Sequence, residues 1–599
     1  MSRTQPWSEP HHDGSALYVA NPAPELGETV PVFLRVPRES GVGEVHLSHV
    51  VDGERLLAPA TVDRTDEWDT WFRADLPVHN PVATYRWLLD GGAHGFQWLN
   101  GTGLHARQVT DAADFRLAAF APPPDWGQDA VLYQVFPDRF AKSRERDAPE
   151  WAIPEAWDAP LSTDRPTLAR QFYGGDLDGV AAHLDHIASL GANTVYLTPF
   201  FPAGSTHRYD ATTFGAVDPL LGGDEALARL SDALHARGMR LMGDLTTNHC
   251  GVGHDWFRAA VADPGSPEAG FFHFEHHPDA YACWLGHPTL PKLDLRNPAL
   301  RRALVEGGDS VVGRWLGVLD GWRIDVANMT GRYRDVDVAH DVARAIRATL
   351  AEVRPDALLL AEHNFDASAD LLGDGWHGTM NYTGFSIPAW QWLSPERPLR
   401  HSLYADTPRL PGGAMVAGMR EVAASVPWRA TAHAMNLVSS HDSERIRTRL
   451  GDDELVVVAL GLMATMPGIP MIWSGDEIGM EGAFGEDGRR PFPWDGPWNE
   501  RLLGAVRALF GARRDSVALR RGGLRWLVVD DDVAAFEREA PGETVVVQVS
   551  RADHAPVRLP AGRFGRDWSG LAGTVDVAPI DGVVELPGDG PAVRMWRTR

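Results

Sequence analysis

An arginine and an aspartate stand in the second half of one short, mostly apolar segment, residues 319–328. It reads Leu-Asp-Gly-Trp-Arg-Ile-Asp-Val-Ala-Asn and is expected to form a buried β-strand. Because side chains alternate along a strand, Arg323 and Asp325 share one face, while Trp322 and Ile324 point to the other. An arginine and an aspartate are costly to bury unless they pair or take part in chemistry. The two residues are therefore either a structural ion pair or part of a reaction centre.

Further acids and histidines, and one asparagine, stand at the ends of three other segments that are predicted to be strands. They are Asp244 and His249 at the end of residues 239–245, Glu362 and Asn364 after residues 357–361, and His441 and Asp442 after residues 434–438. Each alone has a structural explanation, such as a helix cap for Asp442 or a buried core histidine for His249. Together they predict a polar cluster that folding does not require.

Two carboxyl groups that face each other across a small gap suit the cleavage of a glycosidic bond. One attacks the anomeric carbon, while the other protonates the departing oxygen and then activates water. Asp325 suits the attacking carboxylate, because a neighbouring Arg323 is expected to lower its pKa and keep it ionised. Glu362 suits the acid, because it follows the apolar run 357–361 and burial favours the protonated form.

The elements that must position these residues alternate between strand and helix from about residue 129 to residue 513. Strands are predicted at residues 131–136, 194–198, 239–245, 318–326, 357–361, 376–382, 434–438 and 469–473. Helices are predicted at residues 176–190, 224–237, 298–316, 335–354, 414–425, 453–466 and 499–513. Eight alternations favour a (β/α)8 barrel, in which catalytic groups lie at the carboxyl ends of the strands. A doubly wound sheet is the structural rival, but no Gly-x-Gly-x-x-Gly turn follows the first strand.

The segments on either side of the barrel have the short, turn-bounded strands of antiparallel β-domains. A proline-rich stretch at residues 120–126 separates the first of them from the barrel. The irregular segment 250–297 is too long for a plain loop, so we expect a small lobe over the barrel mouth. The predicted domains are a carbohydrate-binding-like or dimerisation β-sandwich at 1–122, the catalytic barrel at 123–249 and 298–513, the inserted lobe at 250–297, and an antiparallel β-domain at 514–599.

Composition limits the possible partners. A formal net charge of −25 argues against a nucleic acid or an anionic membrane surface. No apolar run is long enough to cross a bilayer, and the first residues lack the pattern of a signal peptide. With Cys250 and Cys283 as the only cysteines, a reducing cytoplasm is the simplest location, although pairing of the two stays open. The 22 tryptophans weakly favour a carbohydrate ligand, because their flat apolar faces suit sugar rings.

The segments DLTTNH, GWRIDVAN, AEH and SSHD, in this order and at these strand ends, resemble the four short motifs of the α-amylase superfamily, glycoside hydrolase family 13. The resemblance implies a retaining α-glucan hydrolase with Asp325 as nucleophile, Glu362 as general acid/base and Asp442 as the third acid, which binds hydroxyls of the distorted sugar. It implies further that Asp244, His249, Arg323 and His441 hold the glucosyl unit at the cleavage site. Tyr209, in the segment His-Arg-Tyr-Asp, matches the family's stacking tyrosine.

An N-terminal β-domain, the segment Tyr-Gly-Gly-Asp-Leu at 173–177 and the segment Leu-Pro-Lys-Leu-Asp at 290–294 resemble the neopullulanase, cyclomaltodextrinase and maltogenic amylase group. That group acts on α-1,4 and sometimes α-1,6 bonds in short, branched or cyclic maltooligosaccharides and in pullulan. Lys292 lies in the second segment and is one of two lysines in the chain. It is expected either to bind substrate or to be a solvated surface amine.

Two positions depart from the pattern of that group. Met329 stands where the group usually has glutamate, and Asn364 stands where it usually has tryptophan. Both would flank the acceptor side, so Asn364 is a predicted substrate-binding residue. A transglycosylase or isomerase on the same scaffold remains an alternative, and a non-catalytic sugar-binding protein is a third.

No cofactor is expected. Calcium is a possible ligand, but not in the loop from Phe140 to Asp147, where two arginines and a lysine replace the oxygen ligands that calcium needs. The expected partners are an oligosaccharide and, through the N-terminal domain, a second copy of the chain.

Overall fold

The computed structural model describes residues 6–91, 95–396 and 409–599. Eight parallel strands lie in the order β21-β20-β17-β14-β13-β10-β23-β22, and a parallel bridge between Met380 and Met435 joins the two ends. The predicted barrel is therefore confirmed. The strands are β10 (Leu132–Val135), β13 (Thr194–Leu197), β14 (Arg240–Thr246), β17 (Gly321–Asp325), β20 (Leu358–Ala361), β21 (Gly378–Thr379), β22 (Met435–Leu437) and β23 (Ile469–Trp473).

Helices surround these strands, as the alternation predicts. The longest are α5 (Gly223–His235), α9 (Ala339–Val353), α11 (Gly412–Ala424), α14 (Asp453–Thr465) and α15 (Glu500–Arg514). Leu227, Leu230 and Leu234 of α5 are buried, which is the spacing that places side chains on one face of a helix.

Two predicted helices are each divided. Residues 176–190 form α3 (Leu177–Ala182) and α4 (Leu184–Ser189), which meet at His183. Residues 298–316 form α7 (Pro298–Leu304) and α8 (Val311–Trp315). The first half ends at Leu304 with Val305 as its C-cap, Gly307 follows with φ of 82°, and Ser310 caps the second half by accepting from the Gly313 N–H.

The N-terminal part is a sandwich of two antiparallel sheets. β1 (Thr29–Pro37), β5 (Asp69–Pro77) and β4 (Thr61–Thr65) form one sheet, and β2 (Val42–Val51) pairs with β6 (Val82–Gly91) in the other. Val32, Leu34, Leu47 and Trp87 from the two sheets share one buried core. The alternation of buried and exposed residues along β5 reflects this one-sided burial.

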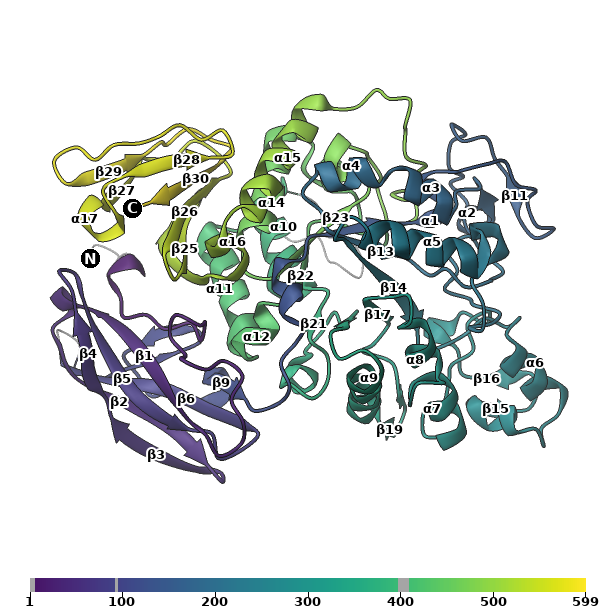
Figure 1. Cartoon of the computed structure of the whole chain (residues 1–599), viewed down its shortest axis with the longest axis horizontal. Coiled ribbons are helices and arrows are strands. Elements are labelled where there is room, and N and C mark those ends of the chain that lie inside the picture. Colours follow the sequence, from purple (N-terminus) through teal and green to yellow (C-terminus); the bar gives the residue numbers. More distant parts are fainter. Residues whose placement is uncertain (1–5, 92–94, 397–408) are drawn as a thin grey trace.

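The C-terminal part is also antiparallel, with a five-stranded sheet in the order β24-β25-β26-β30-β28. Its central strands are β25 (Val533–Ala540) and β26 (Glu543–Ser550). Both β-domains lie on the same side of the barrel, purple and yellow in Figure 1. Buried ion pairs join them, since Arg35 lies 2.7 Å from Asp69, 3.4 Å from Glu537 and 3.1 Å from Glu539.

The segment 250–297 forms α6 (Asp255–Ala262) and the short hairpin of β15 (Phe274–His276) and β16 (Ala280–Tyr281). In Figure 1 this lobe lies at the opposite end of the molecule from the N-terminal sheets. A bridge between His249 and Lys292 ties its return to the end of β14. Cys250 and Cys283 are not bonded to each other. In the part of the chain that is described, no helix has the length and apolarity to cross a membrane.

Candidate active site

One buried arginine connects three carboxyl groups at the carboxyl ends of adjacent strands. Arg323 on β17 is fully buried, and its Nη1 donates to Asp244 Oδ1 at 2.8 Å and to Asp325 Oδ1 at 2.7 Å. Its Nη2 lies 2.9 Å from Glu362 Oε2. The pairing of β14 with β17 places Asp244 directly beside Arg323, and Glu362 follows β20 on the other side. The strand order thus gathers residues that are more than 100 positions apart in the chain.

A strained turn follows Asp325. Val326 has φ of 46°, which a β-branched residue rarely adopts. In this conformation its backbone N–H donates to Glu362 Oε2 at 2.9 Å. Such strain persists only where surrounding contacts hold it, and it is concentrated at functional sites. The turn fixes the position of Glu362 relative to Asp325.

Asp325 is surrounded by more negative than positive charge. Burial raises its pKa well above the ordinary value, Arg323 opposes this, and Glu362, Asp244 and Asp442 raise the pKa further. The sequence predicted that Arg323 would lower the pKa of Asp325 and keep this residue ionised. Arg323 is in contact with Asp325 and lowers its pKa as predicted, but burial and the neighbouring carboxylates outweigh the effect of this one shared arginine. Burial and the neighbouring carboxylates therefore oppose ionisation of Asp325, and Arg323 favours it.

Asp442 is held in the opposite state. Burial alone would raise its pKa, but His441, Arg489 and Arg323 hold it well below the ordinary value. His441 Nε2 lies 2.9 Å from Asp442 Oδ2. Gln134 accepts from the His441 backbone N–H through Oε1, so its Nε2 donates to His441 Nδ1 at 2.8 Å. This orientation turns Nε2 of the imidazole toward the carboxylate.

Arg489 is a functional candidate that sequence reasoning missed. It lies in the loop after β23, donates through Nε to the His441 carbonyl at 2.8 Å, and donates through Nη2 to Asp442 Oδ1 at 3.0 Å. Nothing in its local sequence distinguishes it from the adjacent Arg490, which pairs with Asp487 at the surface. Only the folded loop shows which of the two arginines reaches the site.

Two tyrosines converge on Asp244. The hydroxyl of Tyr209 donates to Asp244 Oδ2 at 3.0 Å and lies 2.5 Å from His441 Nε2, and its ring stacks on the His441 imidazole at 7° between planes. Tyr196 on β13 donates to the same Oδ2 atom at 2.6 Å. Tyr196 and Gln134 were also missed, although each is a polar side chain near the carboxyl end of a barrel strand and could have been found by that signal.

His249 and Lys292 form a second polar group beside the first. Lys292 is 3% exposed, and its Nζ donates to Asn248 Oδ1 and, at 2.9 Å, to the Met329 carbonyl. Asn248 Nδ2 in turn donates to His249 Nδ1 at 3.1 Å. Burial and Lys292 lower the pKa of His249 to about 3, so this histidine is neutral. Lys292 is therefore not a solvated surface amine, and it fastens the ends of β14 and β17 to the inserted lobe.

Asn364 is not brought into this cluster. It follows β20 and lines a separate cavity between the barrel and the two β-domains, where its Oδ1 is buried without a hydrogen-bond partner among the described residues. The other predicted site residues all lie at the barrel mouth.

The loop for which no calcium was expected is held by protein contacts. Asp176 accepts from the Gly179 N–H at 2.6 Å, from Ser143 Oγ at 2.7 Å and from Arg146 Nη2 at 3.0 Å. Its carboxylate caps α3 and neutralises Arg146, so both of its oxygens already have partners.

Comparison with protein families matches residues 134–501 to the catalytic domain of α-amylase. A cyclomaltodextrinase of Bacillus sp. is 31% identical over 87% of this chain and 92% of its own length. Neopullulanase 2 of Thermoactinomyces vulgaris is 30% identical, with coverages of 89% and 91%. The intracellular maltogenic amylase of Bacillus subtilis is 32% identical, with coverages of 69% and 67%.

Solved structures agree with these relatives. A cyclomaltodextrinase superposes with a TM-score of 0.75 at 26% identity, over 99% of both chains. A cyclic α-maltosyl-(1→6)-maltose hydrolase from Arthrobacter globiformis, in complex with that sugar, superposes with a TM-score of 0.67 at 30% identity. This match covers 80% of the present chain and all of the other.

Proposed function

Because the chain belongs to the α-amylase family of glycoside hydrolases, we propose that it cleaves α-glucosidic bonds in short, branched or cyclic maltooligosaccharides or pullulan with retention of configuration. The bonds are α-1,4 and, in suitable substrates, α-1,6. The observation that carries this assignment is the arrangement of Asp244, Asp325 and Glu362 around Arg323 at the carboxyl end of the barrel.

The proposed reaction has two steps. The Asp325 carboxylate attacks the anomeric carbon, and Glu362 gives its proton to the departing glycosidic oxygen, so that a covalent glucosyl-enzyme forms. Glu362 then takes a proton from water, the water oxygen attacks the same carbon, and Asp325 is released. Asp442, ionised beside His441 and Arg489, accepts hydrogen bonds from hydroxyl groups of the sugar while it is distorted in these steps.

The surrounding residues orient the sugar. Tyr209 offers its ring as a stacking surface for the glucosyl unit, and neutral His249 hydrogen-bonds to it. Asp244 hydrogen-bonds to Arg323, Tyr196 and Tyr209, so its role is to hold these three side chains in place around the sugar. Lys292 has an indirect role: it holds Asn248 and the Met329 carbonyl in place and does not contact the substrate. Asn364 lies away from the cleavage point and has a different part, considered below.

The small-substrate preference is supported by the relatives, which are named for cyclomaltodextrins, pullulan and maltose-forming activity. We further propose cytoplasmic location, in line with the relative that is named intracellular. We propose that residues 1–122 form a homodimer contact and residues 514–599 a separate β-domain, with the barrel at 123–249 and 298–513 interrupted by a lobe at 250–297.

A product profile tests this function. Purified enzyme and the Asp325→Asn variant are incubated with γ-cyclodextrin, pullulan, soluble starch and maltotriose. The products are separated by chromatography and identified by mass spectrometry. We expect fast attack on rings or pullulan, slower attack on starch, and no turnover by Asp325→Asn. Products that grow longer or change linkage would contradict hydrolysis and favour transfer to sugar.

A further inference from the structure

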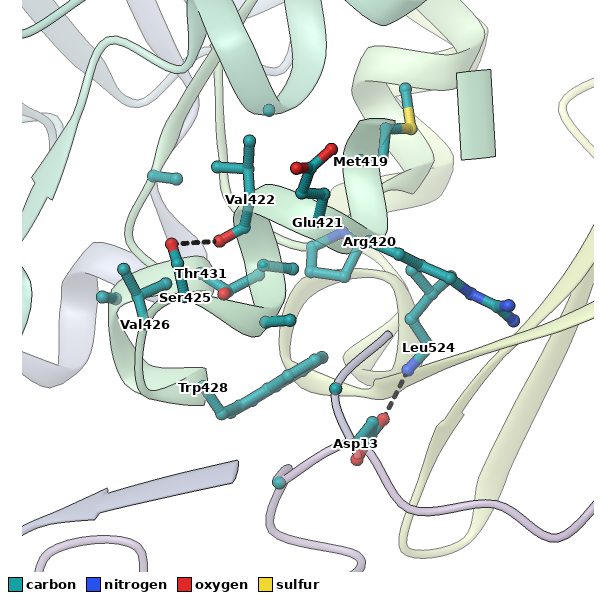
Figure 2. Close-up of a pocket in the computed structure, with 18 of the residues that line it drawn as sticks. Asp13, Met419, Arg420, Glu421, Val422, Ser425, Val426, Trp428, Thr431 and Leu524 are labelled. Carbon is teal, nitrogen blue, oxygen red and sulfur yellow. Dashed lines mark hydrogen bonds between the residues drawn. The ribbon is translucent and has the colours of Figure 1, made fainter. Parts of the chain in front are cut away.

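A large cavity lies between the barrel and both β-domains, apart from the catalytic acids. Its volume is about 820 Å³, within the usual range for small-molecule sites. Its walls come from the N-terminal segment 6–14, α11, α12 (Trp428–Thr431), β24 (Gly523–Val529) and the loop after β20. Figure 2 shows Arg420, Trp428, Asp13 and Leu524 around this space. None of the residues that form the catalytic cluster lines it.

Some of its polar side chains are already used by the fold. Asp13 accepts from the backbone N–H groups of Ser15 and Leu524, and Arg116 donates to the Ala424 carbonyl at 2.6 Å. These contacts hold the three parts of the molecule together around the cavity. The walls are therefore fixed by interdomain contacts, and the space is part of the folded structure.

Other polar side chains of the wall make no hydrogen bond with the described residues. Arg420 on α11 makes none with the described residues, and its pKa is lowered because burial outweighs its attraction to Glu9. The pKa of Glu9 is raised for the corresponding reason. The buried Asn364 Oδ1 also has no partner among the described residues. The unpartnered Asn364 Oδ1 is costly to bury, and Arg420 and Glu9 are charged side chains in a partly buried wall. These groups are therefore suited to a ligand that supplies both donors and acceptors.

The charge of the walls defines the class of that ligand. Four acids, Glu9, Asp13, Asp366 and Glu421, stand against three arginines, Arg116, Arg420 and Arg525. An anion would be repelled by this excess of carboxylates, and a cation would be repelled by the arginines. A neutral molecule with many hydroxyl groups satisfies both, and the half-buried indole of Trp428 offers an apolar face for a sugar ring.

We propose that this cavity is a second binding site for a short α-glucan, distinct from the cleavage site, in which Trp428 supports a sugar ring and Arg420, Glu9 and Asn364 bind its hydroxyls. The choice of an α-glucan rests on the proposed function, because substrate and products of that reaction are the neutral sugars present around this enzyme. The site is also placed to influence catalysis. Asn364, Phe365 and Asp366 in its wall follow directly on the segment that carries Glu362.

The test is calorimetric titration of the Asp325→Asn full chain with maltotriose, which this variant cannot consume. We expect two binding sites per chain. Arg420→Gln in the same background should weaken one of them about tenfold or more, as should Trp428→Ala, and the other site should be unchanged. Arg229→Gln is the matched control, since Arg229 is exposed on α5 and pairs with Asp178. Thermal unfolding of each variant establishes that it is folded.

The outcomes separate this proposal from the proposed function. A single site, or two sites that neither Arg420→Gln nor Trp428→Ala affects, overturns the second site and leaves the hydrolase intact. Binding that depends on Arg420 in a protein that degrades no glucan supports the cavity and contradicts the hydrolase. Inorganic phosphate is the comparison probe, and Arg420-dependent binding of phosphate in place of maltotriose would overturn the assignment to a neutral sugar.

Discussion

Arg489 is expected to set the position and charge state of Asp442, and Arg489→Gln tests this. The substitution removes a charge-assisted hydrogen bond of 3.0 Å to Asp442 and another of 2.8 Å to the His441 carbonyl. A hydrogen bond to a charged group contributes about 1.5–3 kcal/mol. If the bond to Asp442 matters mainly in the transition state, kcat should fall about 10- to 150-fold, with a smaller change in KM.

The same variant should alter the pH dependence in a defined direction. His441, Arg489 and Arg323 together hold the pKa of Asp442 below its ordinary value, so loss of Arg489 allows this carboxylate to protonate at higher pH. Asp442 has to be ionised to accept hydrogen bonds from sugar hydroxyls. Arg489 also offsets the charge of Asp442, which raises the pKa of Asp325, so its loss should move the acid limb of kcat/KM to higher pH. A structural role alone would lower the activity without moving this limb.

The assay is the initial rate of hydrolysis of p-nitrophenyl α-maltoside and γ-cyclodextrin from about pH 4 to about pH 8. Arg490→Gln is the control, because Arg490 is the neighbouring residue and contacts Asp487 instead of the site. If Arg489→Gln and Arg490→Gln agree within about twofold in kcat and share one acid limb, the assignment of Arg489 is refuted.

Three other substitutions give independent predictions. Lys292→Met should lower kcat/KM about tenfold or more by releasing Asn248 and Met329, whereas Lys142→Met, which removes the other lysine, should leave steady-state kinetics unchanged. Tyr209→Phe keeps the ring but loses the hydroxyl that contacts Asp244 and His441, so kcat/KM should fall about tenfold, and an unchanged value would contradict the role of that hydroxyl. Burial and Glu537 raise the pKa of Glu539 to about 7, so its contribution to stability is present below the unfolded-state pKa and is lost as pH rises through about 7. Thermal unfolding should therefore show Glu539→Gln with a flatter stability profile between about pH 5 and about pH 7 than the wild type, and parallel profiles would contradict this.

The strands that carry the acids could be predicted from local sequence. Residues 469–473 were predicted as a strand and form β23 with the same bounds, because a short apolar run follows Pro-Gly and is buried on both faces. The motif residues at the strand ends then meet at one mouth, because parallel strands in a barrel share a direction. Asp244, Arg323, Asp325 and Glu362 are in contact for this reason.

What the sequence could not supply depends on the folded surroundings of each group. The raised pKa of Asp325 results from burial and from three carboxylates on other strands, and a local pattern shows only the adjacent Arg323. From the sequence, Lys292 could be a substrate-binding residue or a solvated surface amine. Only the folded structure shows that the inserted lobe returns to β14 and buries its amine. Asn364 was assigned to the acceptor side from its position after Glu362, but the loop there turns toward the domain junction.

The most direct test of the proposed mechanism is to trap its covalent intermediate. Glu362→Gln is mixed with α-maltosyl fluoride, whose fluoride leaves without help from an acid, and the protein is digested and analysed by mass spectrometry. We predict one maltosyl unit on the peptide that contains Asp325, because its formation needs only the nucleophile and its hydrolysis needs Glu362. A maltosyl adduct on Asp442 or Asp244, or turnover at the wild-type rate with no adduct, would contradict the assignment of Asp325 as nucleophile and Glu362 as acid/base.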